Sequence, residues 1–131
     1  MLIHWLLSSK FKIQLTKTHT LLIKEVDRKV FESIKDGSKT IETRAATEKY
    51  RKMKTGDILN FVCGSNSLQK RITSVRLFCT IEEMIGVLDI KSIMPFVDSV
   101  EAMRQVYYSF PNYEEKIKNF GIIAFEMEER R

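Results

Sequence analysis

Helix-forming and strand-forming segments are segregated along this chain of 131 residues. Three helix starts follow one another in the second half, at Thr80, Asp98 and Asn112, each with a Glu three residues later, the spacing of a capping box. Strand patterns stand before and after this helical block, at residues 21–23, 39–44, 58–63, 67–79 and 122–127. This order predicts an α+β domain whose five to six short strands form a curled or closed antiparallel β-barrel flanked by helices. A doubly wound parallel sheet is the alternative, but regular strand–helix alternation is lacking.

The sequence also predicts a helix after Asp27 and an irregularity in the strand over residues 67–79. Asp27 is a good N-cap for a helix whose apolar stripe is Val30, Phe31 and Ile34, and Gly37 ends it in a left-handed turn. In the strand over 67–79 the apolar phase shifts, which predicts a β-bulge at Thr73-Ser74.

The helix that ends at Gly37 leads into a charged strand, Lys39-Thr-Ile-Glu-Thr-Arg44. Alternation places Glu42 and Arg44 on one face, and a loop or bulge behind Gly37 would bring Lys39 over to them. A Lys, a Glu and an Arg around one cleft suit a phosphate, a nucleobase edge or a polar carbonyl. Alternatively, this is a half-exposed strand whose charges are solvated.

A basic segment follows, in which Lys49, Arg51, Lys52 and Lys54 surround Tyr50. Cations interleaved with an aromatic ring suit phosphate contacts combined with base stacking. The alternative is a solvated connection with one anchoring tyrosine.

The net charge of +5 is distributed unevenly. Residues 1–79 hold 16 Lys or Arg against 7 Asp or Glu, whereas residues 80–131 hold 6 against 10. This asymmetry favours an anionic partner, RNA or DNA before a membrane, although basic residues also serve simply to solubilise a surface.

Length and composition predict one cytoplasmic domain. Apolar residues make up 44% of the chain, but no run approaches the length of a membrane helix, and the short apolar segment Met1–Leu7 lacks the basic leader of a signal peptide. Cys63 and Cys79 are expected to remain reduced, and with only two histidines no zinc-binding spacing exists, so we expect neither metal nor cofactor. Residues 1–19 form either an extension or an extra hairpin, and the main domain covers 20–131.

Several of these residues together resemble one family. The pattern Gly37-x-Lys39-x-x-Glu42-x-Arg44, the turn Thr55-Gly56-Asp57 before a strand, the Tyr107-Tyr108 helix and the closing strand from Gly121 are similar to the ASCH domain family over about residues 20–128. The resemblance implies a PUA-like β-barrel with the signature in a cleft between barrel and helices, and ligands that are RNA, nucleotides or nucleosides.

The same resemblance raises the question of catalysis. One branch of the family hydrolyses the acetyl amide of acetylated cytidine with a Lys, a Thr and a Glu. Lys39 matches that Lys, but Glu42 stands at the position of the Thr nucleophile, and the distant Glu has no assigned counterpart here. Similarity to members thought to cleave RNA leaves that activity open as well.

Three hypotheses follow for this site. In a binding module, Arg44, Lys39 and Arg51 hold phosphate or carbonyl groups, and Glu42 accepts from a base amine. Tyr50 or Tyr107 stacks on the base; because Tyr107 lies on the core stripe of its helix, Tyr108 is the alternative. In a hydrolase, Glu42 is the general base beside the cations Lys39 and Arg44, but those cations lower its pKa and weaken it, which favours binding. In a scaffold, the charges only stabilise the fold. The oligomeric state is left open.

Overall fold

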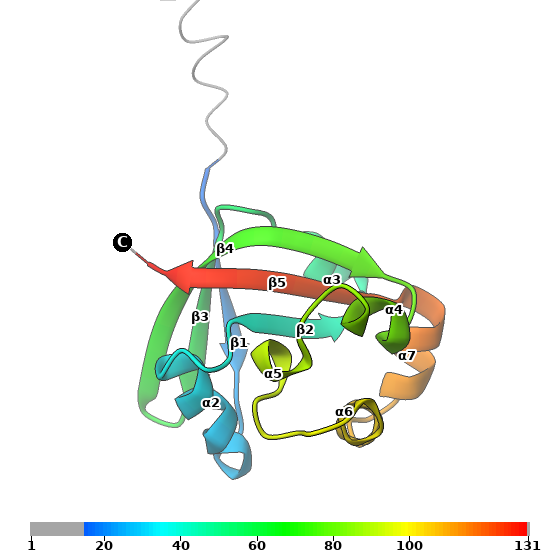
Figure 1. Ribbon diagram of the computed structural model, residues 1–131. Coiled ribbons are helices and arrows are strands. Elements are labelled where there is room, and N and C mark those ends of the chain that lie inside the picture. The colour runs from blue at the N-terminus through cyan, green and yellow to red at the C-terminus, as the bar shows by residue number, and fades with distance from the viewer. Residues whose placement is uncertain (1–14, 131) are drawn as a thin grey trace, which may run out of the picture.

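The computed structural model describes residues 15–130, which form a curled five-stranded sheet with helices around it (Figure 1). The strands are β1 (Thr18–Leu22), β2 (Ile41–Ala45), β3 (Ile58–Cys63), β4 (Asn66–Phe78) and β5 (Ile122–Glu129). The helical elements are the 3₁₀ turn η1 (Glu25–Asp27) and the helices α2 (Arg28–Lys35), α3 (Glu48–Arg51), α4 (Ile81–Ile85), α5 (Ile90–Ile93), α6 (Val100–Tyr108) and α7 (Tyr113–Phe120). The predicted α+β architecture, a curled sheet flanked by helices, is confirmed.

The strands are ordered β1-β3-β4-β5-β2 across the sheet. The pairs β3–β4, β4–β5 and β5–β2 are antiparallel, whereas β1 and β3 are parallel. A parallel pair needs a long crossover, and the segment from η1 through α3 supplies it. The register of β4 against β5 shifts between Ile72 and Ser74, which confirms the predicted bulge.

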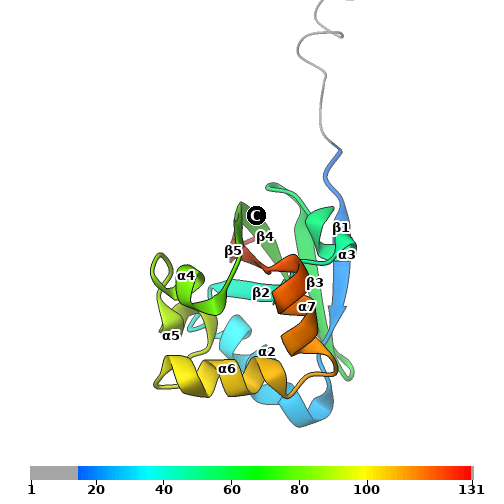
Figure 2. The same cartoon turned by 90° about the vertical axis from the view of Figure 1, so that its right-hand side faces the viewer.

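The sheet buries both faces, and alternation along β5 shows how. Ile122 and Ala124 belong to a core shared with α4, α5, α6 and α7, which surround β2 in Figure 2. Ile123 and Phe125 point the other way, into a second core that includes Phe31 of α2. Both faces are therefore buried over Ile122–Phe125, and on neighbouring β2 Glu42 is buried as well, whereas Arg44 is partly exposed.

The helix ends follow the predicted chemistry with some corrections. Thr80 caps α4 by accepting from the amide of Glu83 at 3.0 Å, and Gly37 has the expected left-handed conformation (φ +87°). The cap of α6 is Ser99, one residue after the predicted Asp98, and its hydroxyl accepts from the amide of Ala102 at 3.1 Å. Asp27 stands at the start of α2 but its side chain makes no capping bond.

The predicted turn at Gly56 is tied together by the next residue, Asp57. Its carboxylate accepts from the main-chain amides of Lys17 and Lys54 at 3.2 and 3.0 Å, and His19 Nε2 lies 2.8 Å from Oδ2. Burial opposes ionisation, but these hydrogen bonds hold the pKa of Asp57 below its usual range. Asp57 therefore anchors β1 to the turn before β3.

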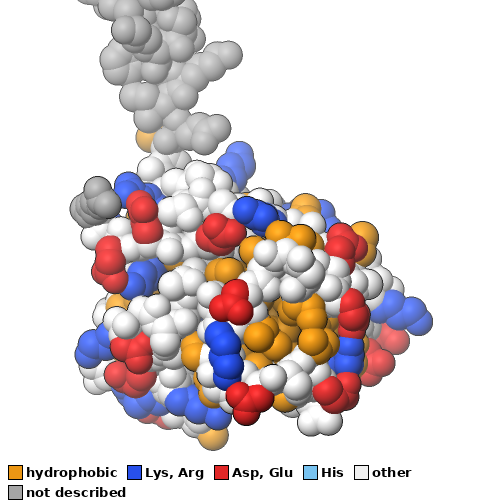
Figure 3. Space-filling model, in the orientation of Figure 1, with side chains coloured by type: hydrophobic (Ala, Val, Ile, Leu, Met, Phe, Trp, Pro, Cys, Tyr) orange, Lys and Arg blue, Asp and Glu red, His pale blue; other side chains and the backbone are white. Residues whose placement is uncertain are grey.

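Residues 1–14 and 131, and with them the predicted strand Ile3–Leu7 and most of the predicted extension, lie outside the described residues. The division of the chain at residue 20 stays a prediction, with β1 beginning at Thr18. Within residues 15–130, no helix has the length and apolar character needed to span a lipid bilayer. The face shown in Figure 3 carries both acidic and basic side chains. Between β4 and β5, Arg71 pairs with Glu128 and Arg76 pairs with Glu126.

Candidate functional site

The carboxylate of Glu42 in β2 is the centre of an ion cluster formed by Lys39, Glu42 and Arg44. Glu42 Oε1 lies 3.4 Å from Lys39 Nζ and accepts from the Thr43 amide at 2.9 Å, while Oε2 lies 3.2 Å from Arg44 Nη2. Strand alternation explains why Glu42 and Arg44 share a face. Lys39 precedes the strand, so its side chain is free of the alternation and reaches Glu42, as predicted.

Lys39 is held on all sides. It is only 5% exposed, and its ammonium donates to the main-chain carbonyls of Ile41 at 2.8 Å and Ile93 at 2.7 Å, the latter at the end of α5. Burial lowers the pKa of Lys39, and the charge of Glu42 opposes that shift. An ammonium has three protons, and two carbonyls and one carboxylate surround it, so Lys39 has no donor left for a ligand.

Glu42 is equally enclosed, at 6% exposed. Burial by itself would raise the pKa of Glu42, but the charges of Lys39 and Arg44 and the Thr43 amide lower it below the usual range. Both carboxylate oxygens are engaged, and Glu42 is ionised at neutral pH.

Arg44 forms the open side of the cluster. Its side chain is 23% exposed, Nη1 donates to the hydroxyl of Tyr50 at 3.2 Å, and the guanidinium carbon lies 5.4 Å from the centre of that ring. Lys49 Nζ lies 5.3 Å from the same ring, so two cations contact Tyr50. Burial disfavours the charged form of Arg44, but the negative charge of Glu42 raises the pKa of Arg44 above the usual range. With five N–H donors on a guanidinium, Arg44 keeps donors beyond those given to Glu42 and Tyr50.

Two further tyrosines complete the surroundings of β2. Tyr107 of α6 is buried, as its place on the predicted core stripe required, and its hydroxyl lies 2.5 Å from Thr43 Oγ1. The hydroxyl of Tyr113 accepts from the Ala45 amide at 3.3 Å. Burial raises the pKa of both Tyr107 and Tyr113, so both hydroxyls are protonated. Sequence reasoning missed Tyr113, because only the packing of α7 against β2 brings its hydroxyl to the amide of Ala45.

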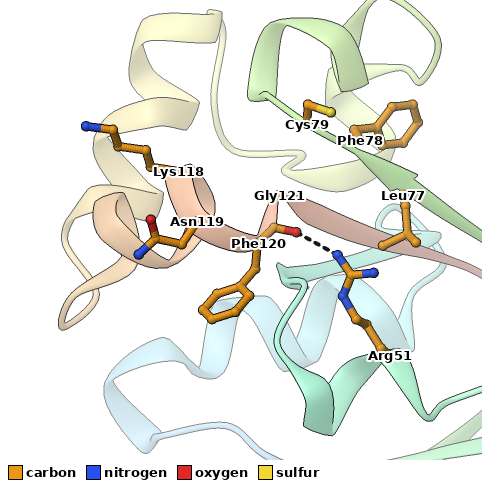
Figure 4. Close-up of a pocket in the computed structure, with 8 residues that line it drawn as sticks. All are labelled: Arg51, Leu77, Phe78, Cys79, Lys118, Asn119, Phe120 and Gly121. Atoms are coloured by element: carbon orange, nitrogen blue, oxygen red, sulfur yellow. Dashed lines mark hydrogen bonds between the residues drawn. The ribbon is translucent and has the colours of Figure 1, made fainter.

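The other predicted site residues lie elsewhere. Arg51 donates to the carbonyls of Ala46 and Phe120 and lines a hollow between α3, the end of β4 and the junction of α7 with β5 (Figure 4). Tyr108 is exposed and lines a second hollow with Glu82 and Glu114. The structure thus brings together Lys39, Glu42, Arg44 and Tyr50, whereas the contacts of Arg51 and the hollow at Tyr108 lie outside this cluster.

The cluster suits an anion better than a metal. Two cations and one carboxylate leave one positive charge, and the part of it that solvent reaches is the guanidinium of Arg44. Over residues 15–130, no three His, Cys, Asp or Glu side chains lie together as metal ligands would.

The curled sheet with helices packed around β2 defines the chain as a PUA-like α+β domain. It belongs to the ASCH domain family, whose model matches residues 25–130. It is similar to the crystal structure of hypothetical protein PH0355 (33% identity, TM-score 0.74, covering 85% of this chain and 97% of that one). It is also similar to the solution NMR structure of protein PF0455 from Pyrococcus furiosus (33% identity, TM-score 0.68, covering 85% and 96%). A search of the curated proteins gives no match.

Proposed function

We propose that this ASCH domain binds RNA or a nucleotide at the Arg44 side of the ion cluster. The observation that carries the proposal is the combination of an ionised, partly exposed Arg44 with the ring of Tyr50 beside it. A guanidinium offers paired donors to a phosphate or a base edge, and a tyrosine ring offers a stacking platform. Family membership supports the same ligand class.

Each member of the cluster has its own role in this proposal. Arg44 contacts the ligand, while Glu42 orients Arg44 through the 3.2 Å ion pair rather than contacting a base, because both of its oxygens are engaged. Lys39 holds Glu42 and the end of α5 in place. Tyr50 stacks on the base, and Lys49, which lies over the same ring, adds positive charge for the phosphates.

Hydrolysis with Glu42 as general base is the weaker hypothesis. A general base needs a pKa near the working pH and access to the proton it removes. Glu42 is enclosed and its pKa is lowered, so it meets neither condition.

The cytoplasmic location expected from the sequence belongs to this proposal. Cys63 and Cys79 are both free thiols, and Cys79 is exposed. Unpaired cysteines are typical of a reducing compartment such as the cytoplasm.

A salt-dependent binding assay with single-stranded RNA and ribonucleotides tests the proposal. Arg44→Ala and Tyr50→Ala should each weaken binding by about tenfold or more, since a good stacking platform contributes roughly 1–3 kcal/mol. Lys35→Ala, which removes one exposed charge from α2, is the matched control and should have little effect. Thermal melts establish that the variants fold. Binding that is unaffected by Arg44→Ala and Tyr50→Ala would contradict the proposed site.

A further inference from the structure

The hollow beside Arg51 is lined by polar, cationic and aromatic groups from three elements. It has a volume of about 250 Å³ and lies where α7 passes into β5, next to the end of β4. Figure 4 shows Arg51 reaching from α3 to the Phe120 carbonyl, with Lys118 and Asn119 on α7. Its lining, which falls within the described part of the chain, contains two cations and no acidic residue.

The geometry of this hollow is fixed by main-chain contacts. Arg51 Nε donates to the Ala46 carbonyl at 2.6 Å and Nη2 to the Phe120 carbonyl at 2.9 Å, so the guanidinium is held at one place. Gly121 has φ +80°, and a Cβ there would lie 2.3 Å from the Phe78 carbonyl oxygen. Only glycine therefore allows the α7–β5 junction to approach β4 this closely.

Apolar surface is exposed at the same place. Phe120 is 48% exposed and Leu77 is 51% exposed. Single-stranded nucleic acids bind where an exposed aromatic ring lies near cations, with the base on the ring and the phosphates on the cations.

The hollow adjoins the Arg44 side of the ion cluster through α3. Tyr50 and Arg51 are consecutive residues, whose Cα atoms lie about 3.8 Å apart. The hydroxyl of Tyr50 contacts Arg44, whereas the side chain of Arg51 contacts Ala46 and Phe120. A strand of RNA that leaves Arg44 therefore has to cross only this one turn of helix to reach the hollow.

We propose that the hollow binds the nucleotide that follows or precedes the one at Arg44 in a single-stranded RNA. This inference rests on the proposed function and deepens it, because it makes the ligand an RNA strand rather than a free mononucleotide. Arg51 contacts the phosphate and Phe120 packs against the base. Lys118, whose side chain leaves α7 on the side away from Arg51 in Figure 4, adds positive charge at the rim of the hollow.

Comparison of mononucleotides with dinucleotides tests the inference. For each of the four bases, the affinity of the ribonucleoside 5′-monophosphate is measured beside that of the 5′-phosphorylated homodinucleotide. For at least one base the dinucleotide should bind about tenfold tighter or more. Lys118→Ala and Phe120→Ala should remove most of that advantage and leave mononucleotide affinity within about twofold.

Controls separate the possible failures. Lys35→Ala lowers the net charge by the same amount as Lys118→Ala and should keep the dinucleotide advantage. Lys118 is exposed, so Lys118→Ala should fold even if Phe120→Ala is less stable. If mononucleotides bind in an Arg44-dependent way but dinucleotides bind no tighter, or if the advantage survives both hollow variants, this inference is overturned and the proposed function stands. If no ribonucleotide or RNA binds through Arg44, both fail.

Discussion

The cations on the two sides of the Glu42 carboxylate differ in whether they keep N–H donors free for a ligand. On one side, the Lys39 ammonium is enclosed by the carbonyls of Ile41 and Ile93 and by Glu42 itself. On the other, the Arg44 guanidinium is partly exposed and shares its donors between Glu42 and Tyr50. The two cations carry the same charge and pair with the same carboxylate, but only Arg44 keeps donors that a ligand could reach.

The difference teaches that burial and donor count decide whether a charge is structural or available to a ligand. A fully coordinated ammonium stabilises the connection between the start of β2 and α5, and a guanidinium with spare donors at a surface is able to bind a ligand. Replacing residues on the Lys39 side should change mainly stability, whereas replacing residues on the Arg44 side should change mainly binding.

Lys39→Met should have the largest effect on stability. Met has a similar length but leaves two buried carbonyls without their donor and leaves Glu42 with one cation fewer. Removing one partner of a buried ion pair costs about 3–5 kcal/mol, and we expect a loss of that order in the free energy of unfolding from urea denaturation. Lys35→Met, on the exposed side of α2, should change it by about 0.5 kcal/mol or less. A loss below about 1 kcal/mol for Lys39→Met would break the comparison.

Glu42→Gln should have a smaller effect that depends on pH. The pKa of Glu42 in the folded chain lies below its ordinary value of 4.5, so the folded chain keeps the carboxylate ionised where the unfolded chain would protonate it. Its contribution to stability is complete above about pH 4.5 and is lost as the pH falls through the lower, folded value. Both proteins are denatured at several pH values from about 3 to about 7. The difference between their free energies of unfolding should shrink as the pH falls. A stability difference that stays constant over this pH range would indicate that the neighbours of Glu42 do not lower its pKa.

Tyr50→Phe should have the smallest effect and sharpens the comparison on the open side. It removes the hydroxyl that accepts from Arg44 at 3.2 Å and keeps the ring. A hydrogen bond to a charged group is worth roughly 1.5–3 kcal/mol when buried, and less at this partly exposed site. We expect a stability change of at most about 1 kcal/mol, measured by thermal melts, and RNA binding close to that of the unchanged protein. A binding loss as large as that of Tyr50→Ala would show that the hydroxyl, not the ring, carries the interaction.

Much of the fold could be predicted from local patterns. The capping box at Thr80, the left-handed Gly37 and the bulge between Ile72 and Ser74 all lie where the sequence indicated. The short helices α3 and α5 were missed, because four residues carry too little periodicity to be recognised. The parallel pairing of β1 with β3 was also missed, since the partner of a strand depends on the whole sheet.

The candidate site was predictable only in part. Alternation correctly grouped Glu42 with Arg44, and the predicted loop after Gly37 brings Lys39 to Glu42. Two contacts could not be predicted: the hydrogen bond from Lys39 to the Ile93 carbonyl and the one from the Ala45 amide to the Tyr113 hydroxyl. In both, the partner lies on a helix more than fifty residues away in the sequence.

By itself, then, the sequence determined where the longer helices and most of the strands form and which charged residues of β2 share a face, because these depend on neighbours within a few positions. Only the tertiary structure decided that Lys39 is enclosed while Arg44 stays open, and that Arg51 faces a hollow of its own. Burial and access to solvent arise when distant elements pack together, and no local pattern records which side chain each of them will cover.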